Sequence, residues 1–283
     1  MSRSSSSLQT KTRVPGTRPV ILNRRGRTEI DRLATEEPLE IRVNGRALAV
    51  LMRTPLTHLE SDLDLVAGFL ASEGVVDDKD DFAALGPCTD PNRAHRENVV
   101  IAQLASGIGN VDNRLKNAQR ELLATGSCGI CGKTSIDHLL QNTSPISPSP
   151  PIDPNLICEL PQKLRARQPV FEVTGGLHGA AIFDRGGHLV NAAEDIGRHN
   201  AVDKVIGQNL RRGRFPLETT ILVVSSRAGF EIIQKALTAR ISAVVALGSA
   251  SSLAHDLASA AGLQLYSFVR SSGFNHHLVS STS

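Results

Sequence analysis

Two short segments with no polar residue most constrain how this chain can fold. Ile221-Leu222-Val223-Val224 and Val244-Val245-Ala246-Leu247 are continuously apolar. A strand with one face in water alternates apolar and polar residues, whereas a strand covered by helices on both faces reads as an unbroken apolar run. Segments with helical spacing follow each run, at residues 230–240 and 253–261. The pattern therefore predicts an α/β fold with a mixed, largely parallel sheet and flanking helices.

The rest of the second half continues this alternation. We expect strands at residues 180–184, 189–192, 220–225, 243–247 and 264–269, and helices at 197–210, 230–240 and 253–261. We expect this sheet to be largely parallel, and an antiparallel edge is compatible with the pattern.

The first half predicts a smaller β-hairpin and α portion. Residues 39–52 hold two apolar stretches around Asn44-Gly45, a pair suited to the positive φ angles of a tight hairpin turn. Residues 62–73 place apolar side chains at helical spacing, residues 98–104 resemble a strand, and residues 112–124 resemble a second helix.

Composition suggests four regions along the chain. Residues 1–28 hold seven Lys or Arg and no acid, which predicts a disordered basic tail. Residues 29–140 form the N-terminal α+β portion. Five prolines predict an exposed linker or loop at residues 141–155, and residues 156–283 form the α/β domain with a ligand cleft.

Charge and cysteine content exclude several classes of protein. Without the tail, 24 basic residues face 28 acidic ones, and aromatic residues make up 3%, so we expect no nucleic-acid partner. No run approaches the roughly 20 apolar residues that span a bilayer, so we expect no membrane segment. Four cysteines in 283 residues suggest reduced thiols and a cytoplasmic protein.

Cys128 and Cys131 form a Cys-x-x-Cys pair within a turn that contains Gly126, Gly129 and Gly132. Such a turn exposes the thiols, and Lys133 beside the pair favours the reactive thiolate. Sulfur or redox chemistry and a purely structural role are both compatible with this spacing. Half a zinc site is a weaker interpretation, since Cys88 and Cys158 are single residues and not a second pair.

Polar residues at strand ends predict an anion site in the second half. Ser225-Ser226-Arg227 and Ser249-Ala250-Ser251-Ser252 each end a predicted buried strand and precede a helix. Ligands gather at the carboxyl ends of strands in open α/β sheets, where helix N-termini present free N–H groups. An ordinary helix cap at each position is the alternative.

Two further motifs could belong to the same cleft. His178 follows Gly175-Gly176 and could donate to a phosphate, ligate a metal or be a core histidine. Residues 194–204 place Arg198 and other polar side chains at a helix start. We interpret this motif as a ligand surface rather than as a solvated ladder of ion pairs.

Taken in order, these motifs resemble those of the FdhD family of sulfur carrier proteins, accessory factors for formate dehydrogenase. The likeness is carried by Glu36-Glu37-Pro38-Leu39, Arg53-Thr54-Pro55, Gly68-Phe69-Leu70 with Glu73-Gly74, Ser127 to Lys133, Thr174 to His178, and Glu194 to Lys204. It covers nearly all of the chain after the tail.

The resemblance implies a sulfurtransferase that accepts sulfur from a cysteine desulfurase and passes it to a molybdenum or tungsten bis-guanine-dinucleotide cofactor. That cofactor is a bound substrate, and no permanent metal is expected. The implied fold is cytidine-deaminase-like and the implied assembly is a homodimer. Cys128 would carry the persulfide and Cys131 would assist. Phe268, Val269, Arg270, Ser271, Ser272 and Gly273 match the cofactor-binding segment, and His178, Arg198 and Arg227 are candidates for the guanine-nucleotide end.

Two alternative functions remain open on sequence grounds. A zinc-dependent, deaminase-like hydrolase would need a glutamate two places after His178, where this chain has Ala180. A chaperone that binds the cofactor without transferring sulfur would use the cysteines only for structure. The chain also departs from the family pattern at Ser226, Gly229 and Ser251, near the predicted cleft.

Overall fold

The structure is a computed structural model that describes residues 14–56, 59–124 and 145–278. Its strands are β1 (Thr17–Arg24), β2 (Arg27–Ala34), β3 (Glu37–Val43), β4 (Arg46–Arg53), β5 (Phe82–Pro87), β6 (Val99–Leu104), β7 (His178–Asp184), β8 (Leu189–Asp195), β9 (Thr220–Val224), β10 (Ala243–Ala246), β11 (Gln264–Arg270) and β12 (Gly273–His277). Its α-helices are α1 (Leu59–Ser72), α2 (Val111–Ala124), α4 (Pro154–Arg165), α5 (Pro169–Thr174), α6 (Arg198–Arg211), α7 (Phe230–Thr238) and α8 (Ser252–Ala261).

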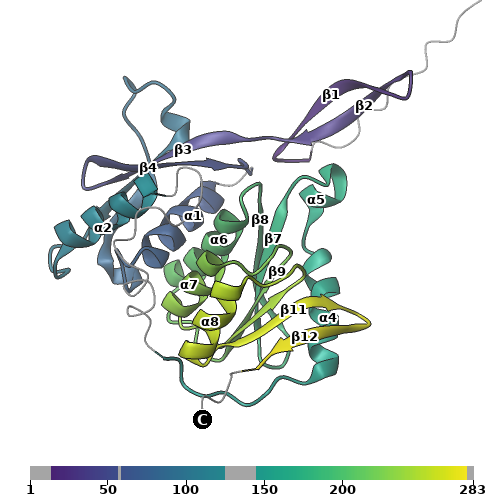
Figure 1. Ribbon diagram of the computed structural model, residues 1–283. Coiled ribbons are helices and arrows are strands. Elements are labelled where there is room, and N and C mark those ends of the chain that lie inside the picture. The colour runs from purple at the N-terminus through teal and green to yellow at the C-terminus, as the bar shows by residue number, and fades with distance from the viewer. Residues whose placement is uncertain (1–13, 57–58, 125–144, 279–283) are drawn as a thin grey trace, which may run out of the picture.

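The larger sheet has six strands in the order β12-β11-β10-β9-β7-β8 (Figure 1). Strands β9, β10 and β11 are parallel, while β7 and β8 on one side and β12 on the other are antiparallel to their neighbours. The predicted α/β fold with a mixed sheet and an antiparallel edge is confirmed, but the sheet is not largely parallel as predicted, since three of its five strand pairs are antiparallel. The second antiparallel edge, β12, was not predicted.

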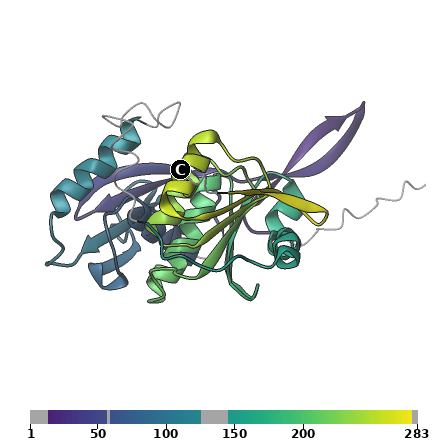
Figure 2. The same ribbon diagram turned by 60° about the horizontal axis from the view of Figure 1, so that its bottom comes forward.

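The two apolar runs are central strands of this sheet, as their composition required. Leu222 and Val224 point into the core shared with α6, α7 and α8, whereas Ile221 and Val223 pack with α4 on the opposite face. Figures 1 and 2 show these helices on the two sides of the sheet. Both faces of the sheet exclude water at this strand, which is why residues 221–224 include no polar side chain.

The predicted hairpin at residues 39–52 is confirmed as β3 and β4. Asn44 and Gly45 turn the chain with φ angles of 48° and 81°. The hairpin belongs to a second sheet of four strands in the order β4-β3-β6-β5, with β3 parallel to β6. Residues of this sheet and of α1 belong to the same buried cluster as α6 to α8. The portions that we separated at residues 141–155 thus share one core.

Two glycines allow the halves of the molecule to meet. A Cβ atom on Gly68 of α1 would lie 1.8 Å from the carbonyl oxygen of Asp203, and one on Gly207 of α6 would lie 1.9 Å from that of Asp64. Carbon and oxygen atoms cannot approach so closely. The two helix backbones are therefore in direct contact, and only glycine fits at the crossing.

Part of the tail predicted at residues 1–28 is ordered, because residues 17–28 belong to the hairpin of β1 and β2, while residues 1–13 lie outside the described residues. Arg25 and Gly26 form its turn with φ angles of 52° and 83°, and Asn23 Oδ1 accepts a hydrogen bond from Gly26 N. The hairpin extends away from the body of the protein (Figure 1). Its high charge suggested disorder, but the turn and the pairing of β1 with β2 order this segment.

Strand β5 and helices α4 and α5 were also not predicted. Helix α4 begins directly after the proline-rich segment, with Asp153 accepting from Asn155 N and Pro154 in the first turn. Proline is compatible with a helix start, so part of the composition that suggested a linker instead marks a helix N-terminus. Among the described residues, no helix is long and apolar enough to cross a membrane.

Candidate functional site

Cys128 and Cys131 lie in the segment 125–144, outside the described residues. Helix α2 ends at Ala124 before this segment, and the described chain resumes at residue 145. Ile146 N then donates to Ala261 O at the end of α8 over 2.9 Å. The role of the two cysteines stays a prediction from the sequence.

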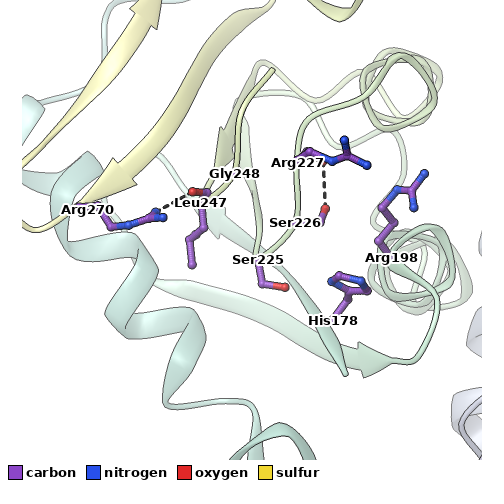
Figure 3. A pocket seen from close by; sticks show the side chains of 8 residues that line it. All are labelled: His178, Arg198, Ser225, Ser226, Arg227, Leu247, Gly248 and Arg270. Carbon is purple, nitrogen blue, oxygen red and sulfur yellow. Dashed lines mark hydrogen bonds between the residues drawn. The ribbon is translucent and has the colours of Figure 1, made fainter. Parts of the chain in front are cut away.

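A pocket of about 450 Å³ opens at one end of the six-stranded sheet. It is lined by His178, Arg198, Ser225, Ser226, Arg227, Leu247, Gly248 and Arg270 (Figure 3). These residues come from the start of β7, the start of α6, the loops after β9 and β10, and the end of β11. The pocket therefore lies at the carboxyl ends of the parallel strands, where ligands gather in open α/β sheets.

Backbone hydrogen bonds beyond the strand ends hold the floor of the pocket. Ser225 N donates to Gly179 O over 2.9 Å, and Ser225 Oγ accepts from Gly179 N over 2.9 Å. Gly248 N donates to Ser226 O over 3.0 Å. A Cβ atom on Gly248 would lie 2.8 Å from Arg227 N, so this backbone approach requires glycine. Leu247 and Gly248 were not predicted as site residues, although the strand-end rule could have found them.

The side chains around the pocket make it strongly electropositive. Arg198, Arg227 and Arg270 supply guanidinium groups, and of the described residues that line the pocket none carries a carboxylate. Figure 3 shows Arg270 on one side and Arg198 with His178 on the other. Arg270 is held against its strand, because Nη1 donates to Leu247 O over 2.6 Å and to Val269 O over 2.7 Å. Such an arrangement suits an anion with several oxygen atoms.

His178 lies half-buried at the start of β7. Burial lowers the pKa of its imidazole, and the nearby Arg198 and His199 lower it further, while Asp195 acts in the opposite direction. The neutral imidazole is therefore favoured. The structure brings the predicted residues His178, Arg198 and Arg227 together with Arg270 in one cavity.

The motif at residues 194–204 is mainly structural, contrary to our interpretation of it as a ligand surface. Asp195 is fully buried and accepts from Thr54 N, Gly197 N, Asn200 Nδ2 and Lys204 Nζ, the last at 2.6 Å. Asn200 also donates to Met52 O. These bonds tie β8 and α6 to the segment that follows β4, so most of the motif joins the two halves of the fold.

Two other carboxylates of this motif, Glu194 and Asp203, are also structural. Glu194 accepts from Val170 N and Phe171 N, and its burial raises the pKa of the carboxyl against the effect of these bonds. Asp203 pairs with buried Lys235 at 2.8 Å and accepts from Ser72 Oγ at 2.8 Å. Burial would lower the pKa of Lys235, but Asp203 and Glu73 outweigh it and raise that pKa.

His199 and Glu231 form a pair beside Arg198. Nε2 of His199 lies 2.5 Å from Oε2 of Glu231, and both side chains are about a third exposed, at 32% and 30%. The hydrogen bond from His199 lowers the pKa of Glu231, against the effect of burial, and the charge of Arg198 contributes in the same direction as the bond. Asp195 and Asp203, the carboxylates of the alternative ladder of ion pairs, bond Lys204 and Lys235 instead of His199.

The predicted cofactor segment runs along one side of the pocket, and only Arg270 lines it. Phe268 is 51% exposed, has a φ angle of 51° at an irregularity in β11, and donates from its N to Gly248 O over 2.9 Å. Val269 is buried. Ser271 and Ser272 form the exposed turn before β12, which begins at Gly273.

The three departures from the family pattern occupy different positions. Ser226 lines the pocket and is 7% exposed. Gly229 is the N-cap of α7 and provides no side-chain cap. Ser251 lies outside the pocket and caps α8, since its Oγ accepts from Ala254 N over 3.2 Å. The second polar strand end is thus a helix cap, which was the alternative to a ligand site.

Among the described residues, no group of three or more His, Cys, Asp or Glu side chains could hold a metal ion. The zinc ligands that a deaminase-like site would need include Cys128 and Cys131, and both lie outside the described residues. His178 itself is surrounded by arginines, a poor environment for a dication.

Comparisons with known proteins identify a family. The sequence model of the FdhD/NarQ family matches residues 34–279. The chain is 45% identical over 254 residues to a sulfur carrier protein FdhD of Corynebacterium efficiens, covering 88% of this chain and 90% of the relative. It is 44% identical over 270 residues to a sulfur carrier protein FdhD of Streptomyces avermitilis, covering 93% of each chain.

One solved structure supports the fold. The crystal structure of a putative formate dehydrogenase accessory protein from Desulfotalea psychrophila superposes with a TM-score of 0.69. It covers 95% of this chain and 99% of that chain at 19% sequence identity. At this identity the likeness concerns the fold alone.

Proposed function

Because the chain belongs to the FdhD/NarQ family, we propose that it is a sulfur carrier required for formate dehydrogenase activity. It accepts sulfur from a cysteine desulfurase as a persulfide on Cys128 and transfers it to a molybdenum bis-guanine-dinucleotide cofactor. The observation that carries the cofactor part of this proposal is the arginine-rich pocket at the strand ends.

The sulfur steps follow from the chemistry of two neighbouring thiols. The Cys128 thiolate attacks the terminal sulfur of the desulfurase persulfide, and the desulfurase leaves as a thiolate. Cys131 then attacks the Cys128 sulfur atom, which forms a Cys128–Cys131 disulfide and expels hydrosulfide for the cofactor. A dithiol reductant must restore both thiols before the next cycle.

The pocket is proposed to hold the nucleotide end of the cofactor, which is a substrate here. Arg198, Arg227 and Arg270 would neutralise its diphosphate, and His178 would donate to a phosphate oxygen. Phe268 to Gly273 would border the bound cofactor along one side. Ser226 contributes a hydroxyl to the lining where the family pattern has glycine, so it changes the shape of this side of the pocket.

The remaining parts of the proposal concern partners and setting. A cysteine desulfurase is the sulfur donor, and formate dehydrogenase receives the sulfurated cofactor. The membership in the FdhD/NarQ family supports this second partner. We further propose a homodimer in the cytoplasm with a cytidine-deaminase-like fold.

The experiment that tests the carrier function measures sulfur on the protein. We expect incubation with a cysteine desulfurase and cysteine to add one labile sulfur atom to the peptide that contains Cys128, as read by mass spectrometry. Cys128→Ser should abolish the addition. Cys158→Ser, a partly buried thiol on α4, is the matched control and should retain it. Absence of the added sulfur with a competent desulfurase would refute the proposal.

Two results would instead favour the alternatives. If Cys128→Ala supports maturation of formate dehydrogenase as well as the wild type, the protein is a cofactor-binding chaperone without sulfur transfer. If elemental analysis finds one tightly bound zinc per chain, the deaminase-like hydrolase becomes the better interpretation.

A further inference from the structure

We propose that His178 couples anion binding in the arginine-rich pocket to the uptake of one proton. The imidazole is neutral in the empty pocket and becomes an imidazolium when a dianionic phosphate group is bound. This inference rests on the proposed binding of a nucleotide diphosphate, and it assigns to His178 the role of a proton-linked positioning residue.

The first support is the placement of the imidazole among cations. His178 lines the same cavity as Arg198, Arg227 and Arg270, which come from α6 and from the ends of β9 and β11. His199 also lies close enough to disfavour a positive charge on His178. In the empty pocket a charged imidazole would face like charges without the hydration of open water.

The second support is that the carboxylate of Asp195, which acts on His178, already has other hydrogen-bond partners. Asp195 lies directly across from His178 in the pairing of β7 with β8. Its carboxylate is fully buried and bonds Lys204 Nζ at 2.6 Å together with three N–H donors. Glu231, beside Arg198, is bonded to His199 at 2.5 Å. Asp195 therefore favours the imidazolium only weakly, as the smallest of the four effects on His178, and the carboxylate of Glu231 is bonded to His199 instead.

A bound phosphate dianion reverses this balance. It neutralises the guanidinium charges around His178 and presents an oxygen acceptor within the cavity. An opposite charge within about 4–6 Å typically shifts a pKa by 1–3 units toward the charged form. His178 lies on the same side of the cavity as Arg198 and on the opposite side from Arg270, so an anion in the cavity lies among these cations (Figure 3).

Proton uptake makes affinity depend on pH in a defined direction. The pKa of His178 is below its ordinary value of 6.5 in the free protein and rises in the complex. The anion therefore binds more tightly as the pH falls. The change in affinity lies between the pKa of His178 in the complex and its lower pKa in the free protein. Within this window the affinity changes by up to about tenfold per pH unit.

Isothermal titration calorimetry with guanosine diphosphate tests the coupling. The measured enthalpy is compared at pH 7.5 in buffers with different ionisation enthalpies, and the slope gives the number of protons taken up. We expect a larger uptake for the wild type than for His178→Gln, which keeps a neutral donor but cannot gain a proton. Any proton that the ligand itself exchanges is common to both proteins and cancels in the comparison.

His188→Gln is the matched control. His188 is on the turn between β7 and β8, its side chain is 84% exposed, and it pairs with Asp184 outside the pocket. This variant should take up as many protons as the wild type. A loss of proton uptake in His188→Gln equal to that in His178→Gln would contradict the assignment.

Histidine NMR on the wild-type protein gives a second measurement that does not depend on calorimetry. The pKa of the His178 signal, assigned by its absence in His178→Gln, should rise when sulfate is added. Sulfate remains a dianion throughout the range of the titration. An unchanged His178 pKa, or equal proton uptake in wild type and His178→Gln, overturns this inference and leaves the sulfur carrier proposal standing. If neither anion binds, both the inference and the proposed nucleotide pocket are overturned, whereas sulfur transfer to Cys128 is tested separately.

Discussion

Replacing Gly207 with alanine tests whether the contact between α1 and α6 holds the two halves together. The new Cβ atom would lie 1.9 Å from Asp64 O and 2.4 Å from Gly68 N. Ordinary van der Waals contact begins near 3.4 Å, so the helices must separate by more than an ångström. Both neighbours are backbone atoms, which cannot move aside as a flexible side chain does.

Two opposing effects determine how much Gly207→Ala changes the free energy of unfolding. Alanine is favoured over glycine in a helix by about 1 kcal/mol. Overpacking in a close-packed core typically costs about 1–3 kcal/mol and sometimes more, and this contact lies at the severe end because backbone meets backbone. We expect Gly207→Ala to lower the free energy of unfolding by about 2 kcal/mol or more. Separation of the helices would also disturb the start of α6, where Arg198 lines the pocket.

Urea unfolding followed by circular dichroism measures this change, and an unchanged m-value shows that stability alone is affected. Gly107→Ala is the control, since Gly107 lies in an exposed turn outside the helices, a Cβ atom there has no neighbour within 4 Å and its φ angle is not in the left-handed region. It should change stability by less than about 0.5 kcal/mol. If Gly207→Ala is as stable as the wild type, the close crossing of α1 and α6 is wrong.

Three further substitutions test the charges and caps around the site. Lys204→Ala leaves the buried Asp195 carboxylate without its cation and should cost about 3–5 kcal/mol in urea unfolding, whereas Lys163→Ala in an exposed pair should cost less than about 1 kcal/mol. Equal costs would contradict a buried ion pair. Ser251→Ala removes the cap of α8 and should lower the free energy of unfolding by about 1 kcal/mol, while no loss of thermal or urea stability would argue against the cap. Glu231→Gln should be destabilising at pH 7, and its difference from the wild type should shrink as pH falls below about 4.5. The lowered pKa of Glu231 contributes stability that is present above the unfolded value and lost as pH falls through the folded one. A difference that is constant between pH 7 and pH 4 in urea titrations would refute the contribution of the His199 bond.

Local patterns in the sequence were sufficient for most of the central fold. The apolar runs at 221–224 and 244–247 require helices on both faces, and Asn44-Gly45 requires a tight turn, whatever the rest of the chain does. The outer elements were harder to predict. The turn at Arg25-Gly26 lies in a highly charged segment, and the proline that starts α4 resembles a linker residue when read alone.

Pocket residues could be predicted from the sequence where they lie at the start or end of a helix or strand. They could not be distinguished from structural residues where hydrogen-bond partners elsewhere in the chain determine what a polar side chain does. Arg198, Arg227 and His178 were recognised from their positions at element ends, and the structure places them in one cavity with Arg270. Asp195 and Lys204 have the same polar character in the sequence as Arg198. They are structural because their partners, including Thr54 N from the other half of the chain, take up their hydrogen-bonding capacity.

The sequence by itself determined the family, the α/β class and the spacing of Cys128 and Cys131, because these depend on residue identity and local periodicity. Only the tertiary structure decided which polar residues face the pocket and which join the two halves of the fold. The physical reason is that the role of a buried charge depends on its partners, and those partners can lie far away along the chain, as in the bond between Thr54 and Asp195, which are 141 residues apart.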